Sequence, residues 1–156
     1  MPATVIPLWR RLDAIDASAP APAELVELLR GIPIFAPLPA PQLERLARAL
    51  VEVRVEPESV VFEAGDHGDR FYVIAEGRAS VAVGGEPVRT LEPGDFFGEI
   101  ALLRDVPRTA TVRAMTALHL LALDRETFVS TVTGHAASAE AAGSVVAARL
   151  PSPAAT

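Results

Sequence analysis

Between residues 51 and 123 the sequence repeats one pattern, in which a short apolar run is followed by a turn rich in glycine or proline. In the first run, VEVRVE, valines alternate with charged residues, which is the period of a strand with one buried face. The pair Gly84-Gly85 predicts a two-residue hairpin, because both positions tolerate a positive φ. The other predicted strands span residues 60–62, 71–75, 79–83, 88–91, 109–114 and 118–123. Many short strands joined by such turns predict an all-β sandwich or barrel.

Helical patterns flank this β region on both sides. Apolar residues recur at helical spacing in residues 24–30 and again in 41–50, where Pro41 suits the first turn of a helix. After the strands, Asp124 is a suitable N-cap for a helix that continues to about Val132. Residues 136–150 form an alanine-rich helical pattern. The predicted order is therefore two helices, a β core and two further helices.

The 156 residues are enough for one domain with its own core. Residues 1–23 are rich in alanine and proline, and the sequence predicts that they form a tail or linker. A second short tail is expected over residues 151–156. The predicted domain thus spans residues 24–150.

Composition excludes several classes of function. A net charge of -6 argues against a surface that follows nucleic-acid phosphates, so no direct nucleic-acid binding is expected. Without cysteine the chain has no disulfides, thiolate nucleophiles or cysteine metal ligands, and its three scattered histidines predict no metal site. We find neither a signal-peptide core nor a stretch of about 18 apolar residues, and expect a soluble, cytoplasmic protein. With no G-x-S-x-G and no acid/base pair of carboxylates, no enzyme activity and no cofactor are expected.

The stretch from Phe97 to Val112, FGEIALLRDVPRTATV, holds a carboxylate and a guanidinium inside apolar flanks. A short helix opening at Gly98 and Glu99 would direct free backbone N–H groups outward, which suits an anion. Arg108 could add a bidentate contact to phosphate oxygens, whereas Glu99 would repel phosphate and suits a sugar hydroxyl. An anion site, a hydroxyl acceptor and apolar surroundings together describe a site for a small nucleotide monophosphate.

The same stretch resembles the phosphate-binding cassette of the cyclic nucleotide-binding domain family, found in catabolite-activator-type regulators and in regulatory subunits of cyclic-nucleotide-dependent kinases. The pattern F-G-E-[IL]-A-L-L-x-x-x-P-R-[TSA]-A is present from Phe97 to Ala110. Residues 60–81, VVFEAGDHGDRFYVIAEGRASV, resemble the second signature of that family, and residues 24–50 are similar to its N-terminal helices. The resemblance implies a β jelly-roll with an N-terminal helical bundle and C-terminal lid helices.

The resemblance also implies roles for individual residues, with cAMP or cGMP as the ligand. Arg108 would hold the cyclic phosphate and Glu99 the ribose 2′-OH. Backbone N–H groups of Gly98 and Ala101 would also contact the ligand, and Ile100 and Val88 would line the base pocket. The further cassette positions implied for the site are Phe97, Pro107, Thr109 and Ala110. The candidates for a lid over the base are Val145, Val146 and Leu150. A threonine at position 109 favours guanine but also occurs in cAMP binders, so both nucleotides stay open.

Two alternatives to ligand binding remain at this point. Arg108 and Glu99 could form a buried structural ion pair, and the whole domain could be a ligand-free module that docks a partner protein. In the ligand-binding interpretation, nucleotide shifts the C-terminal helix and so controls a fused or separate effector. Residues 121–150 resemble the cytosolic tails of bacterial major-facilitator-type transporters, which makes a membrane transporter the predicted effector.

Overall fold

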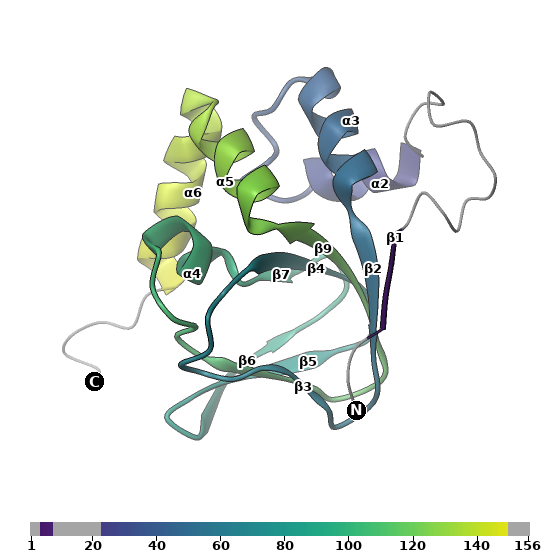
Figure 1. Ribbon diagram of the computed structural model, residues 1–156, viewed down its shortest axis with the longest axis vertical. Coiled ribbons are helices and arrows are strands. Elements are labelled where there is room, and N and C mark those ends of the chain that lie inside the picture. Colours follow the sequence, from purple (N-terminus) through teal and green to yellow (C-terminus); the bar gives the residue numbers. More distant parts are fainter. Residues whose placement is uncertain (1–3, 8–22, 150–156) are drawn as a thin grey trace.

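The computed structural model describes residues 4–7 and 23–149, and its centre is a sandwich of two antiparallel sheets (Figure 1). The first sheet has the strand order β1-β2-β9-β4-β7 and the second has the order β3-β8-β5-β6. The strands of the first sheet are β1 (Thr4–Pro7), β2 (Val51–Val55), β9 (Leu118–Asp124), β4 (Arg70–Glu76) and β7 (Phe96–Phe97). Those of the second are β3 (Val60–Phe62), β8 (Thr111–Ala114), β5 (Ala79–Val83) and β6 (Glu86–Leu91). The mainly β jelly-roll prediction is confirmed.

One strand lies inside the segment for which the sequence predicts only a tail or linker. Residues 4–7 form β1 and pair antiparallel with β2, so that Thr4 stands opposite Arg54 and Pro7 opposite Val51. Without β1, strand β2 would present a row of unpaired backbone N–H and C=O groups at the sheet edge. A run of four residues carries too little periodicity to be recognised as a strand. The extent of the domain, residues 24–150, stays a prediction.

The strand boundaries differ from prediction near the cassette. Strand β8 begins at Thr111, and the predicted first residues of this strand, Thr109 and Ala110, form a bend after Arg108. The two-residue strand β7 was too short for a periodicity to predict. The expected helical turn of the cassette is α4 (Glu99–Arg104).

The other helices lie on one side of the sandwich, over the outer face of the first sheet (Figure 1). They are α2 (Ala23–Arg30), α3 (Ala40–Ala49), α5 (Arg125–Thr133) and α6 (Ala136–Arg149). The predicted N-cap of α5 is confirmed, since a carboxylate oxygen of Asp124 accepts a hydrogen bond from the backbone N–H of Thr127 at 3.0 Å. Among the described helices, none combines the length and the apolarity needed to cross a membrane.

The protein has two hydrophobic cores, because successive side chains of a strand point to opposite faces of the first sheet. In β9, Leu120 and Ala122 face the core between the sheets, while Leu121 and Leu123 face the helices. The helical side is packed around aromatic rings, with Phe71 stacked on Phe128 at 4.5 Å between ring centroids. Burying such large apolar side chains is the main stabilising contribution to a fold of this size.

Helix α6 is attached to the N-terminal helical region by a buried hydrogen bond. The Ser138 hydroxyl donates to the carbonyl oxygen of Ile34 at 2.7 Å. Ser138 and Ile34 are both fully buried, so this bond is shielded from water. The attachment holds the first turn of α6, and the last turn reaches the β sandwich near α4 (Figure 1).

Candidate ligand-binding site

A cavity of about 810 Å³ opens between the second sheet, the cassette and the end of α6. Most residues predicted for the site line it, namely Phe97, Gly98, Glu99, Ile100, Ala101, Arg108, Thr109, Ala110 and Val88. Pro107 does not line it. The cavity is large enough for a mononucleotide, and its walls are mainly apolar with a few charged groups, as is usual for small-molecule sites.

Arg108 lines this cavity and is only 4 % exposed. Its Nη1 donates to the carbonyl oxygen of Gly98 at 3.0 Å, and its Nη2 donates to that of Arg70 at 2.8 Å. The guanidinium carbon lies 4.0 Å from the centroid of the Phe62 ring. Three contacts from separate segments therefore fix the orientation of the guanidinium.

One of the three guanidinium nitrogens of Arg108 makes no hydrogen bond with the described residues. Its Nε is buried and has no hydrogen-bond acceptor among the described residues. Burial lowers the pKa of Arg108, which still keeps its charge because an arginine is protonated at any physiological pH. A buried cation with an unused N–H beside a cavity is the arrangement that an anionic ligand would complete.

Glycines make room for the Arg108 side chain. Gly98 has a φ of 94°, and a Cβ atom there would lie 2.8 Å from Nη1 of Arg108. At Gly68 a Cβ would lie 2.7 Å from the Cβ of Ala101 and 3.1 Å from Nε of Arg108. The sequence analysis missed Gly68, because a glycine that is needed for space rather than for its φ leaves no local signal.

Backbone hydrogen bonds join the loop before β4 to the cassette. The N–H of Arg108 donates to the carbonyl oxygen of Asp66 at 2.8 Å, and the N–H of Gly65 donates back to the carbonyl of Arg108 at 2.8 Å. This loop belongs to the second signature recognised in the sequence, residues 60–81. The two signatures are thus one structural unit, in which the loop of residues 60–81 positions the arginine of the cassette.

Glu99, the first residue of α4, is 1 % exposed. Its Oε1 accepts a hydrogen bond from Nη1 of Arg149 at 3.0 Å. Burial raises the pKa of Glu99, while the charges of Arg149 and Arg89 and a hydrogen bond with its own backbone act against that rise. The alternative ion pair between Arg108 and Glu99 is therefore absent from the described part of the chain, since Glu99 pairs with Arg149 instead.

Arg149 is the functional candidate that sequence reasoning missed. It is the last residue of α6, and besides Glu99 it contacts the carbonyl oxygen of Phe96 at 2.8 Å and lies over the Phe96 ring at 4.2 Å. Its partner is 50 residues away in the sequence, so no spacing rule indicated the pair. Through Arg149 the C-terminal helix is attached directly to the cassette.

The lid candidates lie elsewhere on α6. Val145 packs against the helical core and Val146 is 1 % exposed, and neither lines the cavity. The residues of α6 that do line it are Ala148 and Arg149. Leu150 lies outside the described residues. A role in covering the base stays a prediction for these three side chains.

The sequence profile of the cyclic nucleotide-binding domain matches residues 52–135, which is more than half of the chain and includes the whole cassette. The chain belongs to the cyclic nucleotide-binding domain family. Among curated relatives, the cAMP-dependent protein kinase regulatory subunit of Yarrowia lipolytica is 43% identical over 102 residues, covering 64% of this chain and 27% of the relative. A cGMP-dependent protein kinase of Toxoplasma gondii is 36% identical, with 67% and 10% covered.

Solved structures of this family share the fold. The regulatory domain of Toxoplasma gondii PKA in a co-crystal with cAMP has a TM-score of 0.67 and 33% identity, covering 70% of this chain and 43% of that one. A mutant regulatory subunit of a cAMP-independent protein kinase A from Trypanosoma brucei, bound to cAMP, has a TM-score of 0.69 and 33% identity, covering 72% and 42%. The chain spans about a quarter of the length of the first curated relatives.

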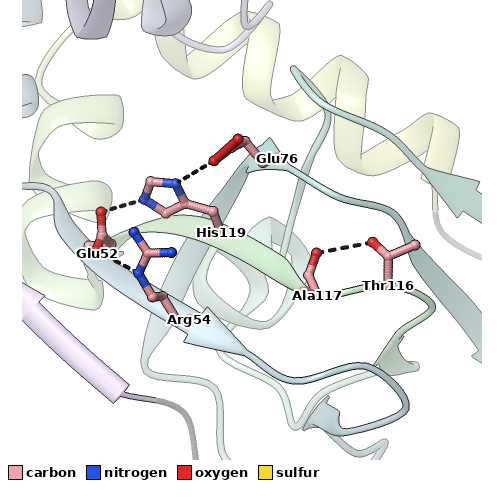
Figure 2. Close-up of polar contacts among 6 residues, drawn as sticks. All are labelled: Glu52, Arg54, Glu76, Thr116, Ala117 and His119. Carbon is pink, nitrogen blue, oxygen red and sulfur yellow. Dashed lines mark hydrogen bonds and ion pairs between the residues drawn. The ribbon is translucent and has the colours of Figure 1, made fainter.

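A second buried carboxylate of this domain lies away from the cavity, on the first sheet (Figure 2). Glu52 of β2 is 1 % exposed, and its Oε1 lies 3.1 Å from Nε of Arg54 while its Oε2 lies 2.5 Å from Nε2 of His119. The other ring nitrogen of His119 faces Glu76 at 3.2 Å. In Figure 2 the imidazole lies between the two carboxylates, and we refer to these four residues as the sheet cluster.

Proposed function

We propose that the cavity binds a cyclic nucleotide, cAMP or cGMP, and that this domain is a regulatory sensor without a catalytic role of its own. The observation that carries the proposal is the buried Arg108, whose Nε has no acceptor within the part of the chain that the structure describes and which lines a largely apolar cavity. The names of the relatives, which are cAMP-dependent regulatory subunits and a cGMP-dependent kinase, support the same ligand class.

In this proposal the residues of the site have separate tasks. Nε of Arg108 donates a hydrogen bond to an oxygen of the cyclic phosphate, whose negative charge compensates the buried positive charge of the guanidinium. The carbonyl oxygens of Gly98 and Arg70 already hold the guanidinium in a fixed orientation. The Glu99 carboxylate accepts from the ribose 2′-OH while its other oxygen keeps the bond with Arg149. Apolar walls exclude water and strengthen both contacts.

Arg149 gives the site a route to an output. Arg149 is the last residue of α6, and its side chain donates a hydrogen bond to Glu99. Any change in the position of Glu99 therefore alters the contact that holds this end of the helix. A bound ligand then shifts the equilibrium between two positions of α6, and the size of the shift is set by the difference between the ligand's affinities for the two conformations. The helix is held at its other end by Ser138, so the expected motion is a pivot of the C-terminal turns.

The test is calorimetry with cAMP and cGMP on the protein and on Arg108→Leu. Removing the partner of the phosphate should weaken binding by about 2–5 kcal/mol. Arg104→Leu is the matched control, because Arg104 also lies on the cassette but is exposed and does not line the cavity. Unchanged affinity in Arg108→Leu would contradict the assignment of the phosphate site.

The competing function is a ligand-free module that docks a partner protein. A thermal-shift measurement separates the two, since ligand at a hundred times its dissociation constant should stabilise the fold by about 2.7 kcal/mol. Absence of a shift with either nucleotide would favour the docking module.

The effector is a separate proposal. The relatives named as regulatory subunits act with protein kinases, whereas the resemblance of residues 121–150 to transporter tails favours a bacterial membrane transporter, with the domain at its cytosolic face. The transporter proposal predicts that cyclic nucleotide alters transport by vesicles containing the full-length protein, and that Arg108→Leu abolishes the response. A response that persists in the variant would overturn it.

A further inference from the structure

A second cleft, of about 370 Å³, lies between α3 and α5, two helices that pack beside each other over the first sheet (Figure 1). It is lined by residues of both helices and of the turn that joins α5 to α6. No described residue lines both this cleft and the cavity beside the cassette. A ligand held here would therefore be distinct from the proposed cyclic nucleotide.

Two buried polar atoms at this cleft have no hydrogen-bond partner among the described residues. They are Oε1 of Gln42, on α3, and Nδ1 of His135, in the turn before α6. A buried donor or acceptor without a partner is costly, because it has lost its hydrogen bonds to water. Both residues line the cleft, so a molecule bound there can satisfy groups on α3 and on the turn at the same time.

The groups around the cleft are mainly hydrogen-bond acceptors. Oε1 of Gln42 can only accept, and the carboxylate of Glu126 carries a negative charge that forms no ion pair with any described residue. The Ser130 hydroxyl already donates to the carbonyl oxygen of Thr127 at 3.4 Å, which leaves its own oxygen free to accept. Arg45 is the lining residue that offers donors alone, and its side chain is exposed, so it can turn toward solvent.

A ligand that satisfies these acceptors must carry donors. A carboxylate ion has none, and Glu126 would repel it. A primary ammonium group has three N–H donors and a positive charge that Glu126 would compensate. The sequence contains no lysine, so no side chain of this protein can supply such a group.

We propose that the cleft between α3 and α5 is a second ligand site, which binds a small primary amine in its protonated form. The ammonium group donates to Oε1 of Gln42 and to the carboxylate of Glu126, and so connects the two helices. The inference does not rest on the proposed nucleotide binding, because the two sites share no described residue.

The sequence provides a direct probe of this site. Gln42 is the only glutamine and there is no asparagine, so its side-chain NH₂ group gives the single carboxamide signal of a proton–nitrogen correlation spectrum. Titration with ethylammonium chloride should shift this signal until the site is saturated. Tetramethylammonium chloride at the same ionic strength is the control, because this cation has no N–H donor. Equal shifts with the two salts would indicate charge screening alone and overturn the inference, as would a signal that ethylammonium leaves unchanged.

The second measurement is the affinity for ethylammonium in Glu126→Ala. Loss of the compensating charge should weaken binding about tenfold or more. Glu44→Ala is the matched control, since Glu44 is an acidic residue of α3 that does not line the cleft. Alanine suits a helix and adds no carboxamide, so the Gln42 signal reports on both variants. An affinity that is unchanged in Glu126→Ala would overturn the inference.

The third measurement separates a ligand contact from a structural one, and uses Gln42→Met. Methionine keeps the length of the side chain and removes an oxygen that has no partner within the described residues, so the thermal midpoint should stay the same or rise. Affinity for ethylammonium, followed by the backbone N–H signal of Gly134 at the cleft, should fall about tenfold or more. A lower midpoint would show that the Gln42 amide supports the fold, and that result or an unchanged affinity would overturn the inference.

Discussion

Glu52 and Glu99 are buried to the same degree, each 1 % exposed, but their surroundings differ. Glu52 is in the sheet cluster, where Arg54 and His119 approach its two oxygens from the same sheet (Figure 2). Glu99 borders the cavity, and within the described residues it forms an ion pair with Arg149 at the end of a helix. The carboxylate of Glu52 is thus paired within its own sheet, and that of Glu99 is paired with the last residue of helix α6.

The difference separates a buried charge that is compensated within the fold from one for which we propose a role in ligand binding. A buried charge stabilises only if its partners compensate for the lost hydration. At Glu99 burial is the largest influence and raises the pKa, so the ionised form is held at some cost. Sites that bind ligands commonly keep such incompletely compensated groups. Three substitutions test this comparison.

The largest expected change in stability is for Glu52→Gln. Loss of the charge weakens two charge-assisted contacts in a buried site, which should lower the free energy of unfolding by about 2–3 kcal/mol in urea titrations. Glu76→Gln is the control, because the Glu76 side chain is 75% exposed and its pair with His119 should contribute less than about 1 kcal/mol. Equal effects of the two substitutions would show that burial of the sheet cluster has no energetic consequence.

The second prediction concerns the space around Arg108. Gly98 and Gly94 have nearly the same φ, 94° and 92°, but only Gly98 would place a Cβ against the guanidinium. Gly98→Ala should therefore be less stable than Gly94→Ala by about 1–2 kcal/mol, the usual range for overpacking. Nucleotide binding should fall in Gly98→Ala alone. If both variants bind and unfold alike, the guanidinium is not confined as the structure indicates.

The smallest change is expected for Glu99→Gln, and it depends on pH. Because burial raises the pKa of Glu99, its contribution favours folding below the ordinary carboxyl pKa and is lost as pH rises through the raised value. The variant lacks this titration, so its stability relative to the unaltered protein should increase with pH and then level off. Unfolding titrations between pH 4 and 8 measure this difference, and a relative stability that falls with rising pH would contradict it.

Much of the fold followed from patterns that involve neighbouring residues. The alternation of valines predicted β2, the pair Gly84-Gly85 predicted the β5–β6 hairpin, and Asp124 predicted the start of α5. The cassette was recognised from its sequence pattern, which in the structure corresponds to a glycine at the N-cap of one short helix, a carboxylate on that helix and an arginine in the loop after it.

Contacts between distant segments could not be predicted in this way. The alternation VEVRV placed Glu52 on the polar face of its strand, yet the sheet cluster buries it. The partner of Glu99 was invisible in the sequence, and so was the need for glycine at position 68.

The amino-acid order alone was sufficient for most of the strands, for the helix cap at Asp124 and for the chemical groups of the cassette, because backbone geometry and capping depend on residues a few positions apart. Which charged side chains form pairs and which carboxylates become buried were decided only when sheets and helices packed together. Those outcomes depend on strand register and on the docking of α6, and both are set by the shape of the whole core.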